Sequence, residues 1–341
     1  MTKSGITVVI PTRNRAESLR RCLQSLAAQR LLPGEVIVVD SSDVLPQTEE
    51  RYPFAFRRKP GEASVCVQRN LGVQEAQTDL VLLLDDDIEL VPEYLERCKA
   101  FLEANPQEGV VTGLWTQKDA KGQWCSSYPP GSLWQLLFAF LFQHSIWGSP
   151  EALTTSRGLR WLHRLLCQYY ARHTNALSKA GWPTVSAVRK PIEQAAVVSL
   201  GASLCRRDWL LAAPYDEVLD PHGIGDNYGV CIALPGPKPM NILTDLVVWH
   251  HHSPANRLQQ SLGFYRRTLA LHYFRHKAKD WSLTKACWYY WSLLGYLLLY
   301  VIRRDGKGLK ATLKIIWLCL SGRNPYALAA KAGKRIQTPE L

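Results

Sequence analysis

The sequence predicts an α/β fold in which a largely parallel sheet carries helices on both faces. Two observations support this prediction. Short apolar runs alternate, over the first third of the chain, with segments whose apolar residues recur at helical spacing. Each apolar run also ends in polar residues, as strands do where they reach the edge of a sheet. The 341 residues are enough to bury a substantial core.

The first strand and helix occupy the N-terminal thirty residues. Residues 6–10 form a β-branched apolar run, and residues 16–29 place apolar side chains at helical spacing. After a Pro-Gly break, residues 35–39 form a second apolar run. Strand, helix and strand within about 35 residues is the length of a βαβ unit, which produces parallel strands.

The same alternation continues as a helix over 63–76, a strand over 79–84, a helix over 92–104 and a strand from 110. Polar residues follow three of the expected strands, at Pro11-Thr12, at 40–43 and at 85–87. Because the carboxyl ends of parallel strands meet at one edge, these groups should lie together in a ligand crevice.

Three consecutive carboxylates, Asp85, Asp86 and Asp87, follow the buried strand over 79–84. Such close like charges raise one another's pKa unless a cation compensates. Mg²⁺ and Mn²⁺ prefer oxygen ligands and often bind through one or two carboxylates plus substrate phosphates. The triplet therefore indicates a metal–diphosphate site, with a solvated acidic turn as the alternative. The chain lacks the Gly-rich loops of Rossmann dehydrogenases and P-loop kinases.

Three adjacent histidines, residues 250–252, follow Trp249. One or two of them could reach the metal or the diphosphate, and we expect His250 to do so. Surface histidines at the end of a strand are the alternative. Arg257, in the loop that follows, could contact phosphate.

Four stretches, in this order and spacing, resemble family 2 glycosyltransferases. They are residues 7–15, residues 35–40, residues 68–72 together with 82–87, and residues 201–209 together with 215–217. The resemblance implies the GT-A fold, a Rossmann-like sheet with helices on both faces. It also implies a nucleotide-sugar donor and transfer with inversion at the sugar.

The resemblance assigns roles at the crevice. Residues near the start would line the nucleoside pocket, Arg69 would approach the diphosphate, and Asp85 and Asp87 would form an Asp-x-Asp pair. The residues expected at the donor are Pro11, Thr12, Arg13, Asp40, Arg69, Asp85 and Asp86. Those expected at a Mg²⁺ or Mn²⁺ ion are Asp87, Asp85 and His250.

The catalytic base of the family normally lies in a Glu-Asp motif before an amphipathic helix. The matching pair here is Asp226-Asn227. If the first position supplies the base, Asp226 serves. If the second does, Asn227 cannot accept a proton, and Asp226 or Asp220 must replace it. We expect Asp226 to deprotonate the acceptor hydroxyl.

The net positive charge of the chain comes from its C-terminal part. Residues 1–255 carry 25 basic and 26 acidic side chains, whereas residues 256–341 carry 16 basic and 3 acidic ones. We therefore expect a catalytic domain over 1–255 and a basic, aromatic helical region over 256–341. Aromatic residues beside Lys and Arg suit the headgroup region of an anionic membrane surface.

The apolar segment over 286–302 is at the lower limit for a transmembrane helix. We expect helices that lie on the membrane rather than cross it, with a helical subdomain packed on the catalytic core as the alternative. The apolar segment over 133–147 is either a core helix or a second segment on the membrane. Nine cysteines without a Cys-x-x-Cys pair, and no signal-peptide pattern at the start, favour a cytoplasmic protein on the inner face of the cell membrane.

The sequence thus predicts a metal-dependent inverting glycosyltransferase that acts on a glycan or lipid-linked acceptor in cell-surface polysaccharide synthesis. Asn227 leaves open a catalytically inactive membrane scaffold. A nucleotidyltransferase is a second alternative, although its Gly-rich, lysine-bearing loop is missing. The basic tail permits nucleic-acid binding, but no recognised motif accompanies it, so we expect no nucleic-acid partner.

Overall fold

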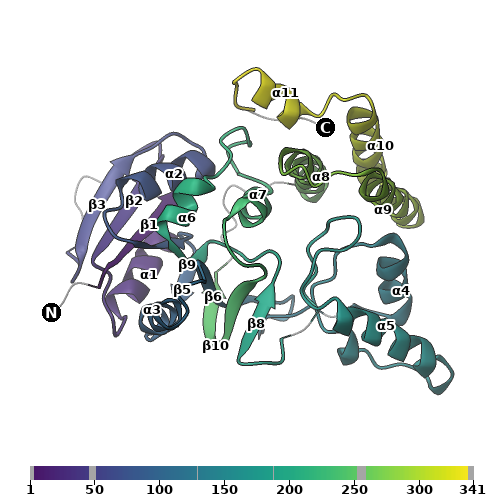
Figure 1. Cartoon of the computed structure of the whole chain (residues 1–341), viewed down its shortest axis with the longest axis horizontal. Coiled ribbons are helices and arrows are strands. Elements are labelled where there is room, and N and C mark those ends of the chain that lie inside the picture. Colours follow the sequence, from purple (N-terminus) through teal and green to yellow (C-terminus); the bar gives the residue numbers. More distant parts are fainter. Residues whose placement is uncertain (1–3, 46–50, 129, 187, 252–258, 337–341) are drawn as a thin grey trace.

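The computed structural model describes residues 4–45, 51–128, 130–186, 188–251 and 259–336. One mixed sheet runs through the described part, with helices on both of its faces (Figure 1). The main strand order is β3-β2-β1-β4-β9-β6-β10-β5. Its strands are β1 Ile6–Thr12, β2 Glu35–Asp40, β3 Ala55–Pro60, β4 Leu80–Leu84, β5 Ile88–Leu90, β6 Val110–Lys118, β9 Ala202–Arg206 and β10 Met240–His250. The short strands β7 Trp124–Cys125 and β8 Ile192–Ala195 pair with β6 and β10.

The expected parallel unit is confirmed, because β2, β1 and β4 run parallel to one another, and β3 extends this unit. The rest of the sheet is mixed, since β9 lies antiparallel between β4 and β6. Alternate residues of the apolar strands enter two separate cores: Val8 packs in one and Val9 in the other. One core holds α1 Ala16–Ala27 and α3 Tyr94–Ala104, and the other holds α2 Val65–Glu75 and α6 Arg207–Ala212. The GT-A-like sandwich predicted from the sequence is therefore present.

The strand β3 was not predicted, because its apolar and polar residues do not alternate and it contains no apolar run. Its sequence includes Arg57, Arg58 and Lys59, and it lies at the edge of the sheet. Ion pairs with the neighbouring strand replace apolar burial: Arg57 Nε lies 2.5 Å from Glu35 Oε1, and Arg58 Nη1 lies 2.5 Å from Asp40 Oδ2.

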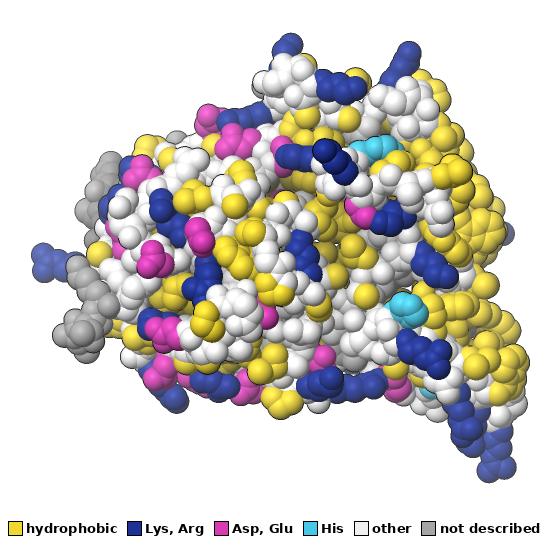
Figure 2. Space-filling model, viewed as in Figure 1, with side chains coloured by type: hydrophobic (Ala, Val, Ile, Leu, Met, Phe, Trp, Pro, Cys, Tyr) yellow, Lys and Arg dark blue, Asp and Glu magenta, His cyan; other side chains and the backbone are white. Residues whose placement is uncertain are grey.

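The middle and the tail of the chain are helical and pack together. The middle segment contains α4 Leu133–Phe142 and α5 Arg160–Arg172, and the tail contains α8 Gln260–Lys277, α9 Leu283–Ile302, α10 Gly306–Leu320 and α11 Pro325–Lys331. These helices stand on one side of the sheet (Figure 1), and apolar side chains gather along that edge of the molecule (Figure 2). No helix among the described residues is both long and apolar enough to span a bilayer.

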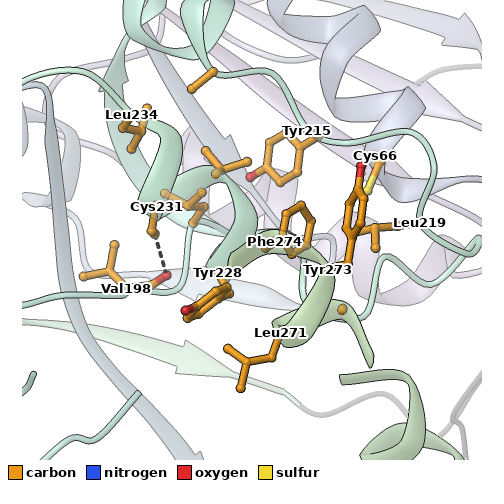
Figure 3. Packing of buried hydrophobic residues seen from close by; sticks show 14 of the residues in the cluster. Cys66, Val198, Tyr215, Leu219, Tyr228, Cys231, Leu234, Leu271, Tyr273 and Phe274 are labelled. Atoms are coloured by element: carbon orange, nitrogen blue, oxygen red, sulfur yellow. Dashed lines mark hydrogen bonds between the residues drawn. The ribbon is translucent and has the colours of Figure 1, made fainter. Parts of the chain in front are cut away.

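The tail helix α8 holds α7 Asp226–Ala233, the helix that begins with the expected catalytic base. Phe274 of α8 packs against α7 beside Tyr228 and Cys231 (Figure 3). At Gly229, a Cβ atom would lie 2.4 Å from the Phe274 ring, so only glycine permits this close packing. One buried cluster thus joins residues from both sides of position 255, and the domain boundary there stays a prediction.

Asp220 ties the tail to the catalytic part of the chain. It is fully buried, and its carboxylate accepts hydrogen bonds from Arg266 Nη1 of α8 at 2.9 Å and from the Tyr326 hydroxyl of α11 at 3.2 Å. Burial alone would raise the pKa of Asp220, but hydrogen bonding by His222 and the charge of Arg266 outweigh burial and lower it. The ionised carboxylate is therefore part of the folded structure at neutral pH.

We expect Asp220→Asn to lower the free energy of unfolding by about 3 kcal/mol, because Arg266 becomes an unpaired buried cation. Since the pKa is lowered in the folded state, this stabilisation is present at neutral pH and is lost as the pH falls through the lowered pKa. Urea denaturation followed by circular dichroism measures the change.

Asp245→Asn is the matched control, because Asp245 pairs with Arg97 at 2.9 Å with both side chains about half exposed. Its cost should be below about 1 kcal/mol, as for other exposed pairs. Equal losses in the two variants would show that the buried pair does not anchor the tail.

Candidate active site

A cleft of about 1540 Å³ opens at the carboxyl ends of β1 and β4 and continues along α7, α8 and α9. The side chains expected at a donor, a metal and a base mostly line this one cleft. They are Pro11, Thr12, Arg13, Arg69, Asp85, Asp86, Asp87, Asp226 and His250. The crevice predicted from the ends of the strands is therefore present in the structure.

The three carboxylates after β4 each have a different partner. Asp85 Oδ1 lies 2.5 Å from Arg69 Nη2. Asp86 accepts a hydrogen bond from Thr12 Oγ1 at 2.7 Å and one from Arg15 Nη1 at 3.0 Å. The repulsion expected between adjacent like charges is thus met by two arginines in the folded protein.

Asp86 is the most buried of these acids, with 3% of its surface exposed. Burial raises the pKa of Asp86 to about 6, although the charge of Arg15 and the Thr12 hydroxyl act in the opposite direction. The hydrogen bond from the Thr12 hydroxyl also fixes the position of the Asp86 side chain at the end of β1, where it lines the cleft.

Asp87 is the carboxylate best placed for a cation. Its Oδ1 atom lies 3.4 Å from His250 Nε2, and its Oδ2 atom lies 3.4 Å from Arg15 Nη1. Trp115 contacts the edge of the His250 ring, with the ring centres 5.3 Å apart. Asp85 instead points toward Arg69, and no three His, Cys, Asp or Glu side chains in the described residues are arranged as a metal-ligand set.

Arg69 of α2 joins the acidic triplet to Asp226. Its side chain is 5% exposed, forms a very short contact with Asp226 Oδ2 as well as the pair with Asp85, and lies 4.9 Å from the centre of the Tyr215 ring. Burial raises the pKa of Asp226, and the charge of Arg69 offsets only part of that rise. A carboxylate with a raised pKa is a better proton acceptor near neutral pH.

Both residues of the Asp226-Asn227 pair line the cleft at the start of α7, and they differ in their partners. Gly225 precedes α7 with φ of 100°, a left-handed conformation that favours glycine. Asn227 uses its amide oxygen to accept a hydrogen bond from Leu200 N–H at 3.3 Å. Asp220, the other acid considered from the sequence, is committed to Arg266 and does not line the cleft. Asp226 is thus the carboxylate of this motif that reaches the cleft.

Two further expected donor-site residues lie at the ends of β1 and β2. Arg13 lines the cleft, and its Nη2 atom is 3.5 Å from Asp43 Oδ1. Asp40 is buried against Arg58, accepts a hydrogen bond from Ser42 N–H at 2.8 Å and is not among the lining side chains. In the structure, Asp40 therefore shapes the loop after β2.

The side chain of His251 turns to Glu89, whereas its backbone N–H donates to the carbonyl oxygen of Asp87 at 2.9 Å. His251 Nε2 lies 2.7 Å from Glu89 Oε2, and its ring meets the edge of Trp124. His252 and Arg257 lie outside the described residues.

Two residues that the sequence analysis missed complete the floor of the cleft. Arg15 contacts Asp86 and Asp87 from the start of α1. Gln68 donates from Nε2 to the carbonyl oxygens of Thr12 at 2.9 Å and Val39 at 2.7 Å, which joins the ends of β1 and β2. The signal for Arg15 was its place in the polar turn after the first strand, and Gln68 directly precedes Arg69.

The mixed sheet, with an acidic cluster at a strand end and a buried arginine facing a second carboxylate, defines the GT-A class of sugar-nucleotide-binding folds. Residues 7–166 match the family model described as glycosyl transferase family 2. The match covers a little under half of the chain, and this part is similar to family 2 glycosyltransferases.

Curated relatives agree with this assignment. An uncharacterised glycosyltransferase of Bacillus subtilis, YwdF, is 32% identical over 102 residues, which cover 29% of this chain and 38% of that protein. The pre-mycofactocin glycosyltransferase of Mycobacterium tuberculosis is 35% identical over 88 residues, which cover 24% of this chain and 18% of the relative. This chain therefore spans well under half the length of either relative.

A solved structure of GalNAc-T7 with UDP, GalNAc and Mn²⁺ superposes with a TM-score of 0.50 and 12% identity, over 88% of this chain and 57% of that one. At this identity the similarity shows a common fold.

We expect Arg69→Met to lower the free energy of unfolding at neutral pH by about 3 kcal/mol, because Asp85 and Asp226 lose their shared cation. The raised pKa of Asp226 should rise further without the guanidinium. A raised carboxyl pKa contributes stability at low pH that is lost as the pH rises through it. The melting temperature of the variant should therefore fall more steeply than that of the wild type as the pH rises above the ordinary pKa of an aspartate.

Arg57→Met is the matched control, since Arg57 also joins two carboxylates, Glu35 and Glu75, but is 37% exposed. Its effect should stay near 1 kcal/mol or below. A pH-independent loss in the Arg69 variant would contradict the coupling between Arg69 and Asp226.

Proposed function

We propose that this protein transfers a sugar, with inversion, from a nucleotide-sugar donor to a glycan or lipid-linked acceptor in cell-surface polysaccharide synthesis. The observation that carries the proposal is the meeting of an acidic cluster, a buried arginine and a second carboxylate in one cleft of a chain that is similar to family 2 glycosyltransferases. The cleft is large enough to hold a donor and an acceptor together, and proximity of the two reactants supplies much of the rate enhancement in such transfers.

The donor would lie across the ends of β1 and β4. Pro11, Thr12 and Arg13 would line the nucleoside end, and Asp40 would support it through the loop after β2. Asp85 and Asp86 would face the donor, and Arg69 would approach its diphosphate. The fold-related GalNAc-T7 was solved with UDP, GalNAc and Mn²⁺, which supports a donor of the nucleoside diphosphate class.

The residues present fit a Mg²⁺ or Mn²⁺ ion. Asp87 Oδ1 and His250 Nε2 converge to 3.4 Å at the cleft, and Asp85 is two residues away on the same turn. One or two carboxylates completed by substrate phosphates are a common ligand set for these ions, to which His250 would add a nitrogen. Asp87 and His250 would hold the ion, and Asp85 would be a third ligand. The bound ion would stabilise the charge on the leaving diphosphate.

Asp226 would act as the general base. Its carboxylate lies in the cleft, and burial raises its pKa toward the range that suits proton transfer. The contact with Arg69 orients the Asp226 carboxylate in the absence of substrate. The proton of the acceptor hydroxyl would pass to Asp226 as the hydroxyl oxygen attacks the anomeric carbon.

We also propose that the protein works in the cytoplasm as a peripheral protein on the inner face of the cell membrane. The net charge of residues 256–341, with 16 basic and 3 acidic side chains, supports an anionic surface as its partner.

A thermal-shift titration tests the donor and metal sites together. We expect one nucleoside diphosphate to raise the melting temperature in the presence of Mn²⁺, because ligands that bind the folded state stabilise it. The shift should be lost in Asp87→Ala and kept in His251→Ala, since His251 pairs with Glu89 instead. No shift with any nucleotide, in a well-folded protein, would favour the inactive scaffold.

Asp226→Asn should lower kcat by about 10²- to 10⁴-fold, the usual contribution of a general base. The nucleotide-dependent thermal shift should survive, because the change leaves Asp85 to Asp87 in place. Product formation measured by release of the nucleoside diphosphate gives the rate.

Asn227→Ala is the comparison, because Asn227 also lines the cleft beside Asp226 but carries an amide, whose oxygen accepts a hydrogen bond from Leu200 N–H. We expect a loss of less than about tenfold in kcat, well below the loss of a general base. Equal activity of Asp226→Asn and the wild type would remove Asp226 from the mechanism.

A further inference from the structure

Large apolar side chains are exposed on four helices, α4, α5, α9 and α10. We call this surface the docking face. Four of its members, one from each helix, are each between 63% and 68% exposed: Trp134, Trp161, Ile302 and Leu320. Further exposed members on the same helices are Leu141, Leu165, Trp291, Leu294, Leu298, Val301, Leu313 and Trp317. Single exposed apolar residues are ordinary, but a gathering of this size marks an interaction site.

The members of the docking face follow helical spacing. On α9, Trp291, Leu294, Leu298 and Val301 recur every three or four residues and therefore form one stripe. On α10, Leu313, Trp317 and Leu320 do the same. The opposite sides of both helices are buried, so the stripes are a separate apolar surface and not loosely packed core.

The four helices are adjacent although they come from two distant parts of the chain. Trp291 Nε1 of α9 donates to the Leu141 carbonyl of α4 at 2.8 Å, and the Trp291 ring stacks on Phe142 with centres 5.2 Å apart. The helices α5 and α10 pack on α4 and α9 respectively. Figure 1 places all four along one side of the molecule, and Figure 2 shows apolar side chains gathered along that edge with Lys and Arg among them.

The charge on these helices identifies the partner. None of the four contains an aspartate or a glutamate. Exposed basic residues border the apolar members, and they are Arg160, Arg164, Arg303, Arg304, Lys307 and Lys310. Exposed tryptophans beside Lys and Arg, without acids, match the headgroup region of an anionic bilayer.

We propose that the docking face binds the surface of an anionic lipid bilayer, with α4 and α5 contributing as well as the tail helices. This deepens the membrane location proposed above by assigning it a surface, and it does not depend on sugar transfer. The helices lie on the bilayer, in agreement with the finding that none of the described helices can span it. Binding combines apolar insertion with attraction between the basic border and the lipid headgroups.

Co-sedimentation with vesicles tests the proposal on the full chain. We expect binding to vesicles of phosphatidylglycerol and phosphatidylcholine, weaker binding as salt is raised, and little binding to phosphatidylcholine alone. Ile302→Ser/Leu320→Ser should weaken the partition by about tenfold or more, because both side chains would insert. Trp134→Ser/Trp161→Ser should weaken it to a similar extent, which tests the contribution of α4 and α5.

Ile192→Ser/Leu211→Ser is the matched control. It removes the same two residue types at exposed positions, on β8 and α6, outside the docking face. This control should bind vesicles like the wild type. Absence of vesicle binding by the wild type, or equal losses in the control and face variants, would overturn the proposal. If only the tail variant lost binding, the composite face would be wrong.

The nucleotide-dependent thermal shift is measured on every variant. A retained shift with lost vesicle binding supports the docking face and leaves the donor site untouched. A missing shift in the wild type, with vesicle binding intact, would contradict the proposed transfer and not the docking face.

Discussion

The Arg69 guanidinium is the interaction on which the site depends. It places one positive charge between Asp85, at the end of β4, and Asp226, at the start of α7. Without it, two carboxylates from different parts of the chain would share a poorly solvated space. Arg69 is itself enclosed by Tyr215 and is only 5% exposed, so its position is fixed by packing as well as by charge. One side chain therefore joins the acidic triplet to Asp226 across the cleft.

The C-terminal helices pack against the helix that carries Asp226 and so support the site. Phe274 of α8 packs on Gly229 of α7, and Arg266 of α8 pairs with Asp220 just before α7. The helix that carries Asp226 is thus held between the sheet and the tail. A basic, aromatic tail that looks like an appendage in the sequence is part of the core that positions the candidate base.

The sequence predicted the parallel part of the sheet because strands such as β1 and β4 are continuous apolar runs that end in polar residues. It could not predict β3, in which Arg57 and Arg58 pair with acids on β2 in place of an apolar run. The acidic triplet was found from its place after a buried strand, and Arg69 was found because its segment resembles a family. Arg15 was missed, since only the fold brings it to Asp86 and Asp87, and the loop role of Asp40 depends on Arg58 from an unpredicted strand. The antiparallel β9 in the middle of the sheet also has no local signal, because its position follows from long-range pairing.

One side of the helix α9 is exposed on the docking face, and another side lines the cleft. Leu294 and Leu298 are exposed on the docking face, whereas Tyr296 and Tyr300 line the cleft. In a chain docked through that face, the single helix α9 would separate the cleft from the lipid. The donor end of the cleft would stay open to water. An acceptor anchored in the same leaflet would then find the enzyme by diffusion in two dimensions, at an effective concentration set by the membrane area and not by the volume of the cell. The linker between the lipid anchor and the sugar of such an acceptor would need to be about as long as one helix is thick.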